Sequence, residues 1–509
     1  MGLSKKLTAS LVHKKLLDFG LFPEKIENVF SSEKFGRWVR KTGYSKYKDR
    51  HFSHISFKLT RSNNAPRILN IPHPIAYIRL CNEIKTNWKN FFDKIGEVAD
   101  YQKRSMIIPK PNNLNERLVS MLSYNKNKKE KFITLEKQTS KKYYVHADIS
   151  NFYPNIYSHS IAWALVGKET AKKNQKDDTL WYNKIDFAVR GQQRNETIGI
   201  AIGPDTSGII AELILSQVDK DLEHYSYTRY IDDYNCFCES KDKAEQFLRD
   251  LSRSLEKYNL RLNAKKTKIV ELPTELDDDW VRQLRDFSNA HLGNAKKEIT
   301  SGDLTKVSDF LDLAISLNEK NPEEATIRYA AQILTKKKYA SKKVFAFVII
   351  YLSRICFIHP YFIDLFHKLL RVNKKLIDKK LLSLIEDEIN SIINEQVKNS
   401  LSDVSLWAVY LAKEYNFEIK DFESISNSII SSRDCMPTLI CYLYAKKKKL
   451  PLKKYLDLVA DLMDEQLEDE WWIYIYEVFR DNSTKPAFKK ISYKDFYKEL
   501  VTAKITFIA

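Results

Sequence analysis

Two adjacent carboxylates, Asp232 and Asp233, stand in a Tyr-Ile-Asp-Asp tetrapeptide at residues 230–233. Short aromatic and apolar runs flank it at 225–229 and 234–238. Asp is disfavoured inside strands and favoured at turns, so this pattern predicts a β-hairpin with both carboxylates at its bend. Paired carboxylates suit a hard divalent cation such as Mg²⁺. An Asp-Asp turn without catalytic function is also common, so the tetrapeptide alone does not decide between the two interpretations.

Asp148 provides a second acidic position upstream. It ends a β-compatible run at 142–148, and a turn follows it. If the two strand ends converge, Asp148 and Asp232 can bind two divalent ions. Such ions, about 3.5–4 Å apart, clamp the attacking and leaving oxygens of a phosphoryl transfer. The spacing therefore predicts a nucleotidyl-transfer site.

The elements that must position these carboxylates follow from the surrounding sequence. A glycine- and proline-containing loop at 199–207 opens a long apolar helix, for which Asp205 or Ser207 is the expected N-cap. A turn before an ordinary core helix is the alternative interpretation of this loop. After the hairpin, a helix is expected at 240–258 and a lysine-bearing strand at 260–270. The order β-α-β-β-α-β is that of a split βαβ palm.

Together, these blocks resemble motifs A to D of a reverse transcriptase, in the same order. The residues that carry this resemblance are Asp148 with Phe152 and Tyr153, the loop 199–207, the Tyr-Ile-Asp-Asp tetrapeptide, and Leu262-Asn263 followed by Lys266. The run 158–172 and the form Ile202-Gly203-Pro204 are similar to the bacterial abortive-infection (Abi) reverse transcriptases of phage defence. The resemblance covers roughly residues 50–275.

The resemblance implies a set of site residues. Metal binding falls to Asp148, Asp232 and the Ile149 carbonyl, with Mg²⁺ or Mn²⁺ as cofactor and Asp233 as the accompanying catalytic acid. The resemblance also implies a nucleotide site. In it Tyr153 is the steric gate and Phe152 packs beneath it, Arg117 contacts the phosphates, Lys266 is the motif D lysine, and Gly203 belongs to the motif B loop. Arg104 and Lys110 are further candidates for the phosphate contact, and a solvated surface cation is the alternative for each of the three.

One position departs from the pattern of templated reverse transcriptases. These enzymes usually carry glutamine in the motif B loop, where this chain has Ile202. An apolar side chain offers no hydrogen bond to a template base or an incoming nucleotide. The family implication is DNA synthesis from dNTPs without a supplied template, primed by a protein tyrosine, so that single-stranded DNA becomes covalently attached. Tyr44 and Tyr47, in the basic segment 40–50, are the priming candidates expected to be exposed.

Two other functions stay open at this point. One is a conventional RNA-templated reverse transcriptase, against which Ile202 counts. The other is a non-catalytic helical-repeat protein that binds nucleic acid and carries a vestigial palm. The intact carboxylates Asp148, Asp232 and Asp233 argue against that loss of function.

Composition supports a folded protein with a polyanionic partner. The chain has 509 residues, 43% of them hydrophobic, and a formal net charge of +18. Lys and Arg that neutralise phosphates release counterions, so this charge favours nucleic acid as a partner. The six cysteines form no paired metal-binding motif, and no apolar run is long enough to span a membrane. A cytoplasmic bacterial protein without a membrane partner is expected.

The distribution of glycine divides the chain. All twelve glycines fall at or before Gly302, and helical periodicity dominates afterwards at 344–370, 381–397 and 450–467. We predict an α+β fold, with reverse-transcriptase-like fingers and palm at 1–275 and an all-α, HEAT-like helical domain at 276–509. An irregular helical bundle is an equal alternative for the second domain. The family also implies a homo-oligomer.

Overall fold

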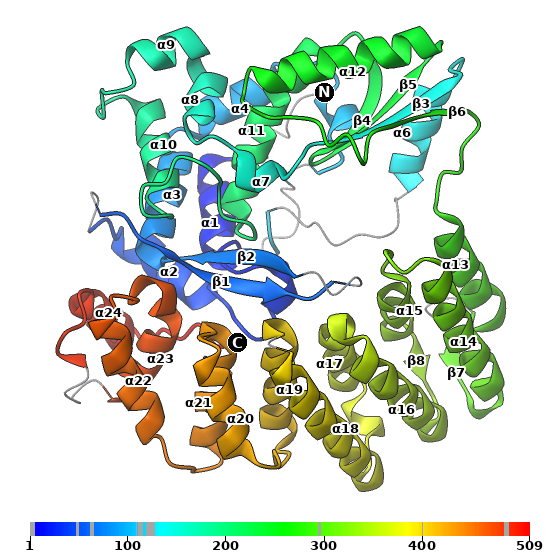
Figure 1. Cartoon of the computed structure of the whole chain (residues 1–509), viewed down its shortest axis with the longest axis vertical. Coiled ribbons are helices and arrows are strands. Elements are labelled where there is room, and N and C mark those ends of the chain that lie inside the picture. Colours follow the sequence, from blue (N-terminus) through cyan, green and yellow to red (C-terminus); the bar gives the residue numbers. More distant parts are fainter. Residues whose placement is uncertain are drawn as a thin grey trace. The chain divides into compact units, whose positions relative to one another are not determined.

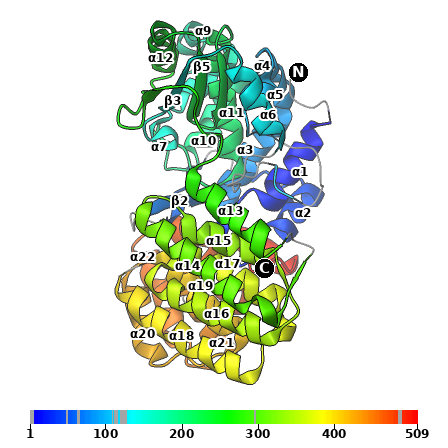
Figure 2. The same ribbon diagram turned by 90° about the vertical axis from the view of Figure 1, so that its right-hand side faces the viewer.

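The computed structural model describes residues 6–46, 50–61, 66–107, 109, 116–118, 128–293, 297–399, 401–482 and 488–509 (Figures 1 and 2). The chain forms two compact units. Unit 1 contains Met1–Ile55, Asn70–Leu276 and Tyr493–Ala509, and unit 2 contains Ser56–Leu69 and Asp277–Ser492. The chain passes between the units next to the predicted boundary, but residues 56–69 and 493–509 belong to the opposite units from those expected.

A four-stranded antiparallel sheet is the centre of unit 1. It has the order β4-β5-β3-β6 and consists of β3 (Tyr143–Asp148), β4 (Ser226–Tyr230), β5 (Asp233–Cys238) and β6 (Lys268–Glu271). Helices separate β3 from β4, and α12 (Lys241–Glu256) separates β5 from β6. This is the β-α-β-β-α-β order predicted for the palm. The last strand is shorter than expected, because Leu262 makes only an isolated bridge with Ile149 before the chain turns.

Strand alternation gives the sheet two different faces. On β3, Val145 and Ala147 are buried among apolar residues, whereas Tyr144 and His146 alternate with them and remain partly exposed. α12 contacts both β3 and β5 and buries Phe247 (Figure 1). The helices therefore cover the apolar side of the sheet, and the polar side is left for chemistry.

The long helix before the hairpin is α11 (Asp205–Asp221), which is buried along most of its length. It begins at Asp205, and its N-cap is Pro204, without a side-chain capping bond. The predicted caps Asp205 and Ser207 are therefore wrong. Both side chains are buried inside the first turn, and an ion pair with Arg117 occupies the Asp205 carboxylate.

The other helices of unit 1 surround the sheet and α11. They are α1 (Ala9–Phe19), α2 (Glu33–Thr42), α3 (Pro74–Thr86), α4 (Trp88–Gly96), α5 (Tyr101–Arg104), α6 (Lys128–Gln138), α7 (Phe152–Asn155), α8 (His159–Val166), α9 (Lys168–Lys173), α10 (Trp181–Arg190) and α24 (Lys494–Thr502). The C-terminal segment packs against the N-terminal one. Phe507 contacts the rings of Phe22 and Phe35, and Ile508 forms a bridge with Phe30.

Unit 2 is a succession of helices. They are α13 (Asp279–His291), α14 (Leu304–Lys320), α15 (Thr326–Thr335), α16 (Lys342–Ile358), α17 (Ile363–Val372), α18 (Lys379–Lys398), α19 (Ser402–Tyr415), α20 (Phe422–Ser431), α21 (Cys435–Lys447), α22 (Lys453–Asp464) and α23 (Trp472–Asn482). Each helix contacts the next but one along the chain in several cases. For example, α17 contacts α19, and α19 contacts α21. The unit is not entirely helical, because β7 (Glu298–Ile299) and β8 (Lys338–Tyr339) form a short parallel pair.

A hairpin also contributes to unit 2. β1 (His54–Leu59) pairs with β2 (Arg67–Pro72), and the far end of this hairpin belongs to unit 2. There the Thr60 backbone N–H and hydroxyl donate to the two carboxylate oxygens of Asp403, at 3.1 and 2.6 Å. A buried carboxylate with two donors is a specific anchor for the hairpin.

The structure also decides the position of several side chains. The aromatic cluster Trp471, Trp472, Tyr474 and Tyr476 is buried in the core of unit 2. All six cysteines are free and buried. Within the described ranges, no helix combines the length and the hydrophobicity needed to cross a bilayer.

Candidate active site

The hairpin of β4 and β5, predicted to carry the catalytic aspartates, has a strained two-residue turn. β4 and β5 pair as far as Tyr230 opposite Asp233, which leaves Ile231 and Asp232 as the loop. Ile231 has φ 56°, in the left-handed region, which costs an L-residue about 1–2 kcal/mol. Both loop carbonyls are held: Ile231 O accepts from Arg229 Nη1 at 3.0 Å, and Asp232 O accepts from the Ile149 N–H at 3.2 Å. Contacts from outside the loop therefore stabilise the turn.

Two carboxylates face each other across β3 and β5. Asp148 lies directly opposite Asp233 in the register of the strands. Burial, together with the neighbouring Asp148 carboxylate, raises the pKa of Asp233 to about 6. Two carboxylates in such proximity resist simultaneous ionisation unless a positive charge is supplied. The pair is therefore a site that favours a cation.

Two residues that follow α12 contact Asp148. Asn263 Nδ2 donates to Asp148 Oδ1 at 3.0 Å, and the Asn263 N–H donates to the Asp148 carbonyl at 2.8 Å. Lys266 Nζ lies 3.2 Å from Asp148 Oδ2. The predicted motif D lysine is thus beside the carboxylates, and its ammonium supplies positive charge there.

The carboxylates at the ends of β3 and β5 offer oxygen ligands for a divalent ion. Among the residues that the structure describes, no group of three or more His, Cys, Asp or Glu side chains is arranged to hold a metal. The chemistry of the pair still fits a hard cation, because Asp148 and Asp233 offer oxygen ligands and the second has a raised pKa. The sequence assigned Asp148 and Asp232 to the metal, whereas the strand register pairs Asp148 with Asp233. Asp232 lies in the adjoining turn and is half-buried.

Three further side chains lie on the polar face of the sheet, and sequence reasoning missed them. Tyr144 donates its hydroxyl proton to Asn235 Oδ1, and His146 Nδ1 lies 3.2 Å from the same oxygen. His146 Nε2 is 3.9 Å from Asp233 Oδ1. The i, i+2 spacing of Tyr144, His146 and Asp148 is the signal that could have identified this row.

Phe152 and Tyr153 directly follow the turn after Asp148. Asn151 adopts a left-handed conformation (φ 42°) and α7 begins at Phe152. Phe152 is buried and its ring centroid is 5.2 Å from that of Tyr153. The Tyr153 carbonyl accepts from the Ile200 N–H at 3.0 Å. The motif A and motif B segments are therefore joined at the residue predicted to be the steric gate.

The motif B loop is fixed against β2. The Ile202 N–H donates to Asn70 Oδ1 at 3.0 Å, and the Asn70 N–H donates to the Ile202 carbonyl at 2.7 Å. Gly203 follows with φ 126°, and a Cβ added there would lie 2.8 Å from Pro23 Cγ. Only glycine fits this combination of backbone conformation and close approach. Its predicted importance to the loop therefore has a steric basis.

The predicted phosphate contact of Arg117 is not what the structure shows. Its guanidinium forms ion pairs with Asp205 and Glu27 and donates to the Phe22 carbonyl at 2.7 Å. The buried Asp205 carboxylate requires a compensating charge, and Arg117 provides it. The guanidinium of Arg104, the second candidate for this contact, donates to the backbone carbonyls of residues 99, 223 and 225. Lys110 lies outside the described residues.

Tyr44 is not exposed as expected. Its side chain is 6% accessible and packs between Trp38 and Phe496, with ring centroids 5.2 Å away in each case. It nevertheless lines a cavity of about 380 Å³, together with Lys46, Arg79 and Lys184. Tyr47, the second candidate, lies outside the described residues.

Comparison with known proteins agrees with this geometry. Residues 82–300 match the model of the reverse transcriptase (RNA-dependent DNA polymerase) family. The protein thus has a reverse-transcriptase domain. It is a nucleotidyltransferase, namely a DNA polymerase of the reverse-transcriptase type. No curated protein matches the chain. Among solved structures, it is similar to apo telomerase from Candida tropicalis, with 13% identity over 78% of this chain and 76% of that one. The TM-score of 0.33 is too low to support any inference.

Proposed function

We propose that this protein is an abortive-infection polymerase of phage defence, which adds dNTPs without copying a template and primes synthesis on its own tyrosine. The observation that carries the proposal is the environment of Ile202. Its side chain is apolar, and Asn70 already occupies both its backbone N–H and its carbonyl. The N–H is thus already used, and the side chain offers no hydrogen bond to a template base or an incoming nucleotide. We therefore expect no selection of a base by the side chain at this position.

The reaction joins a hydroxyl oxygen to the α-phosphorus of a dNTP. In the first cycle the oxygen is that of a tyrosine and in later cycles that of a DNA 3′ end. A P–O bond forms, the bond to the β-phosphate oxygen breaks, the hydroxyl proton is lost, and pyrophosphate leaves. Lys266 is the group proposed to donate a proton to pyrophosphate, because its ammonium lies at the carboxylates.

Mg²⁺ or Mn²⁺ would be held by Asp148, Asp232 and the Ile149 carbonyl, with Asp233 beside them. A divalent ion neutralises charge on the phosphoryl oxygens when it is bound. Other side chains of the protein orient the carboxylates and select the sugar. Asn263 orients the Asp148 carboxylate, and Tyr153 on its packed neighbour Phe152 would exclude a ribose 2′-hydroxyl.

Tyr44 and Tyr47 are the proposed priming residues, and Tyr44 would have to leave its place between Trp38 and Phe496 for its hydroxyl to attack a dNTP. The cavity beside Tyr44 includes the side chains of Lys46, Arg79 and Lys184, and Lys46 Nζ lies 6.0 Å from the Tyr44 ring centroid. Cations at a tyrosine suit an oxygen that becomes a phosphodiester. A cytoplasmic homo-oligomer with attached single-stranded DNA completes the proposal.

The test is incorporation of labelled dNTPs by purified protein with Mg²⁺, without primer or template. Asp232→Ala is the inactive control, and Tyr44→Phe, which removes only the hydroxyl, tests priming. Products are separated on a denaturing protein gel before and after nuclease. Nuclease-sensitive label that migrates with the wild-type polypeptide, absent from Asp232→Ala, supports the proposal. Loss of that label in Tyr44→Phe assigns the primer to Tyr44.

An RNA-templated reverse transcriptase is the second candidate, because the matching family model is that of an RNA-dependent DNA polymerase. A primed poly(rA) template distinguishes the two. A templated enzyme would incorporate dTTP alone, whereas the proposed enzyme uses the four dNTPs in the same proportions with and without poly(rA). Incorporation that depends on the template refutes our interpretation of Ile202.

A further inference from the structure

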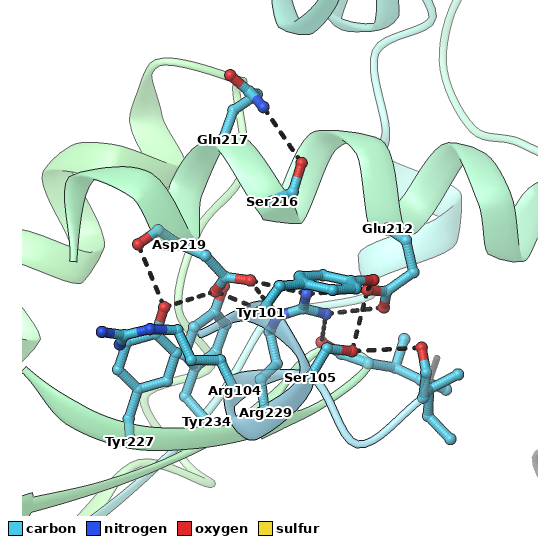
Figure 3. A network of polar contacts seen from close by, with 12 residues as sticks. Tyr101, Arg104, Ser105, Glu212, Ser216, Gln217, Asp219, Tyr227, Arg229 and Tyr234 are labelled. Carbon is cyan, nitrogen blue, oxygen red and sulfur yellow. Dashed lines mark hydrogen bonds and ion pairs between the residues drawn. The ribbon is translucent and has the colours of Figure 1, made fainter. Parts of the chain in front are cut away.

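A buried network of charged and polar side chains lies beneath the catalytic hairpin (Figure 3). At its centre is Arg229, the last residue but one of β4, whose side chain is fully buried. Its Nη1 donates to Glu212 Oε1 at 2.9 Å, and its Nη2 donates to Asp219 Oδ2 at 2.8 Å. Burial of an arginine requires this kind of pairing, because an uncompensated charge away from water is strongly unfavourable.

Both carboxylates come from α11. Glu212 and Asp219 are seven residues apart, which is close to two helical turns, so they lie on the same face of the helix. This spacing lets one guanidinium bind both. Because the fork of the guanidinium is planar and rigid, two carboxylates on a fixed helix determine the orientation of all its N–H groups.

The other partners of the carboxylates close the network. Tyr101 and Ser105 donate to Glu212 Oε2, at 2.5 and 3.0 Å. Tyr227 donates to Asp219 Oδ1 at 2.9 Å, and the Tyr234 hydroxyl lies 3.3 Å from the same oxygen. Figure 3 shows these hydroxyls converging on the two carboxylates from several elements. With their remaining oxygens engaged, Glu212 and Asp219 cannot rotate away from Arg229 without breaking other bonds.

The Nη1 group of Arg229 links Glu212 to the backbone of the hairpin loop. Nη1 also donates to the Ile231 carbonyl at 3.0 Å, and Ile231 is the left-handed residue that precedes the two aspartates. We propose that Arg229 is a positioning residue: the α11 carboxylates fix its guanidinium, and the guanidinium holds the Ile231 peptide so that Asp232 and Asp233 are presented to the nucleotide. The proposal rests on the polymerase activity proposed above for the site.

The decisive comparison is between Arg229→Lys and Arg328→Lys. Lysine keeps the charge but cannot bind two carboxylates and a carbonyl in fixed directions. Arg328 is a matched control, because it is also buried and binds a carboxylate, that of Asp364, and a backbone carbonyl, that of Tyr361, within unit 2. Both changes should lower the melting temperature. Only Arg229→Lys should lower kcat, by about ten-fold or more, with KM for dNTP little changed.

Two further measurements separate positioning from simple destabilisation. Hydrogen exchange of the peptide that spans 226–238 should be faster in Arg229→Lys than in wild type and unchanged in Arg328→Lys. This readout needs no activity, so it remains informative if the wild-type protein incorporates no dNTP and the proposed function fails. In the double variant Arg229→Lys/Ile231→Gly, glycine adopts the left-handed conformation without strain. Its kcat should recover relative to Arg229→Lys.

The proposal is overturned if Arg229→Lys retains wild-type kcat and exchange, if Arg328→Lys loses kcat to the same extent at an equal loss of melting temperature, or if glycine at 231 brings no recovery. Should Arg229→Lys not fold, Glu212→Gln replaces it, because it keeps the shape but removes the charge that orients Nη1. The same losses of kcat and exchange protection are expected of it, and their absence refutes the proposal equally.

Discussion

Asn263→Ala is the substitution that best tests how the carboxylates are oriented. The Asn263 amide donates to Asp148 Oδ1 at 3.0 Å, while its backbone N–H donates to the Asp148 carbonyl and is kept in the variant. The variant loses this side-chain bond and a second, weaker one, in which Asn263 Oδ1 accepts from the Lys265 N–H at 3.2 Å. A hydrogen bond to a charged group contributes about 1.5–3 kcal/mol. If that contribution is realised in the transition state, kcat falls by about 10- to 100-fold, since each 1.36 kcal/mol is a factor of ten.

The assay is the initial rate of dNTP incorporation over a range of dNTP concentrations. KM should change little, because the amide contacts the carboxylate and not the nucleotide. Asn155→Ala is the matched control. The Asn155 amide donates to the Ser150 carbonyl at 3.0 Å, in the turn that follows Asp148, and does not contact the Asp148 carboxylate. A kcat of Asn263→Ala within two-fold of wild type, or an equal loss in Asn155→Ala, would refute the orienting role.

Three other predictions concern the loop, the gate and unit 2. Gly203→Ala should lower the unfolding free energy by about 1–3 kcal/mol, the usual cost of such backbone strain, because its φ of 126° and the nearby Pro23 leave no room for a Cβ; thermal denaturation measures this, and an unchanged melting temperature would contradict it. Tyr153→Ala should admit ribonucleotides, measured as incorporation of labelled rNTPs, and continued rejection would remove the steric gate from Tyr153. Burial raises the pKa of Asp434 to about 6, so the folded protein binds a proton at Asp434 more tightly than the unfolded chain does. This protonation contributes its full stability below about pH 3.8, and the contribution is lost as the pH rises through 6. Asp434→Asn should therefore raise the unfolding free energy at pH 8 by up to about 3 kcal/mol, with no gain at pH 3.5, as urea denaturation at the two pH values will show.

Local patterns predicted where the candidate carboxylates lie. Asp148, Asp232 and Asp233 were placed at strand ends and a hairpin bend because Asp is disfavoured inside strands and favoured at turns. Their flanking strands follow from two-residue periodicity, and the order of elements in the palm follows from these. No long-range information was needed for either inference.

Residues whose surroundings come from distant segments were predicted less well. Arg117 looked like a free cation, because its partner Asp205 lies 88 residues later in the chain. Tyr44 looked exposed, because the residue that covers it, Phe496, comes from the other end of the chain. Asn263 was noticed only as part of motif D, without its contact to Asp148, and Arg229 gave no signal, since an arginine in a strand acquires its role only from the face of α11.

The strain of the turn at Ile231 explains why such distant contacts matter here. A left-handed Ile231 is unfavourable in an isolated hairpin, so the loop sequence alone does not specify the conformation that presents Asp232 and Asp233. The required free energy comes from hydrogen bonds to the two loop carbonyls, one from the end of the motif A strand and one from Arg229. The second depends in turn on the carboxylates of α11. The position of Asp232 and Asp233 is therefore a property of the assembled palm and not of the loop sequence alone.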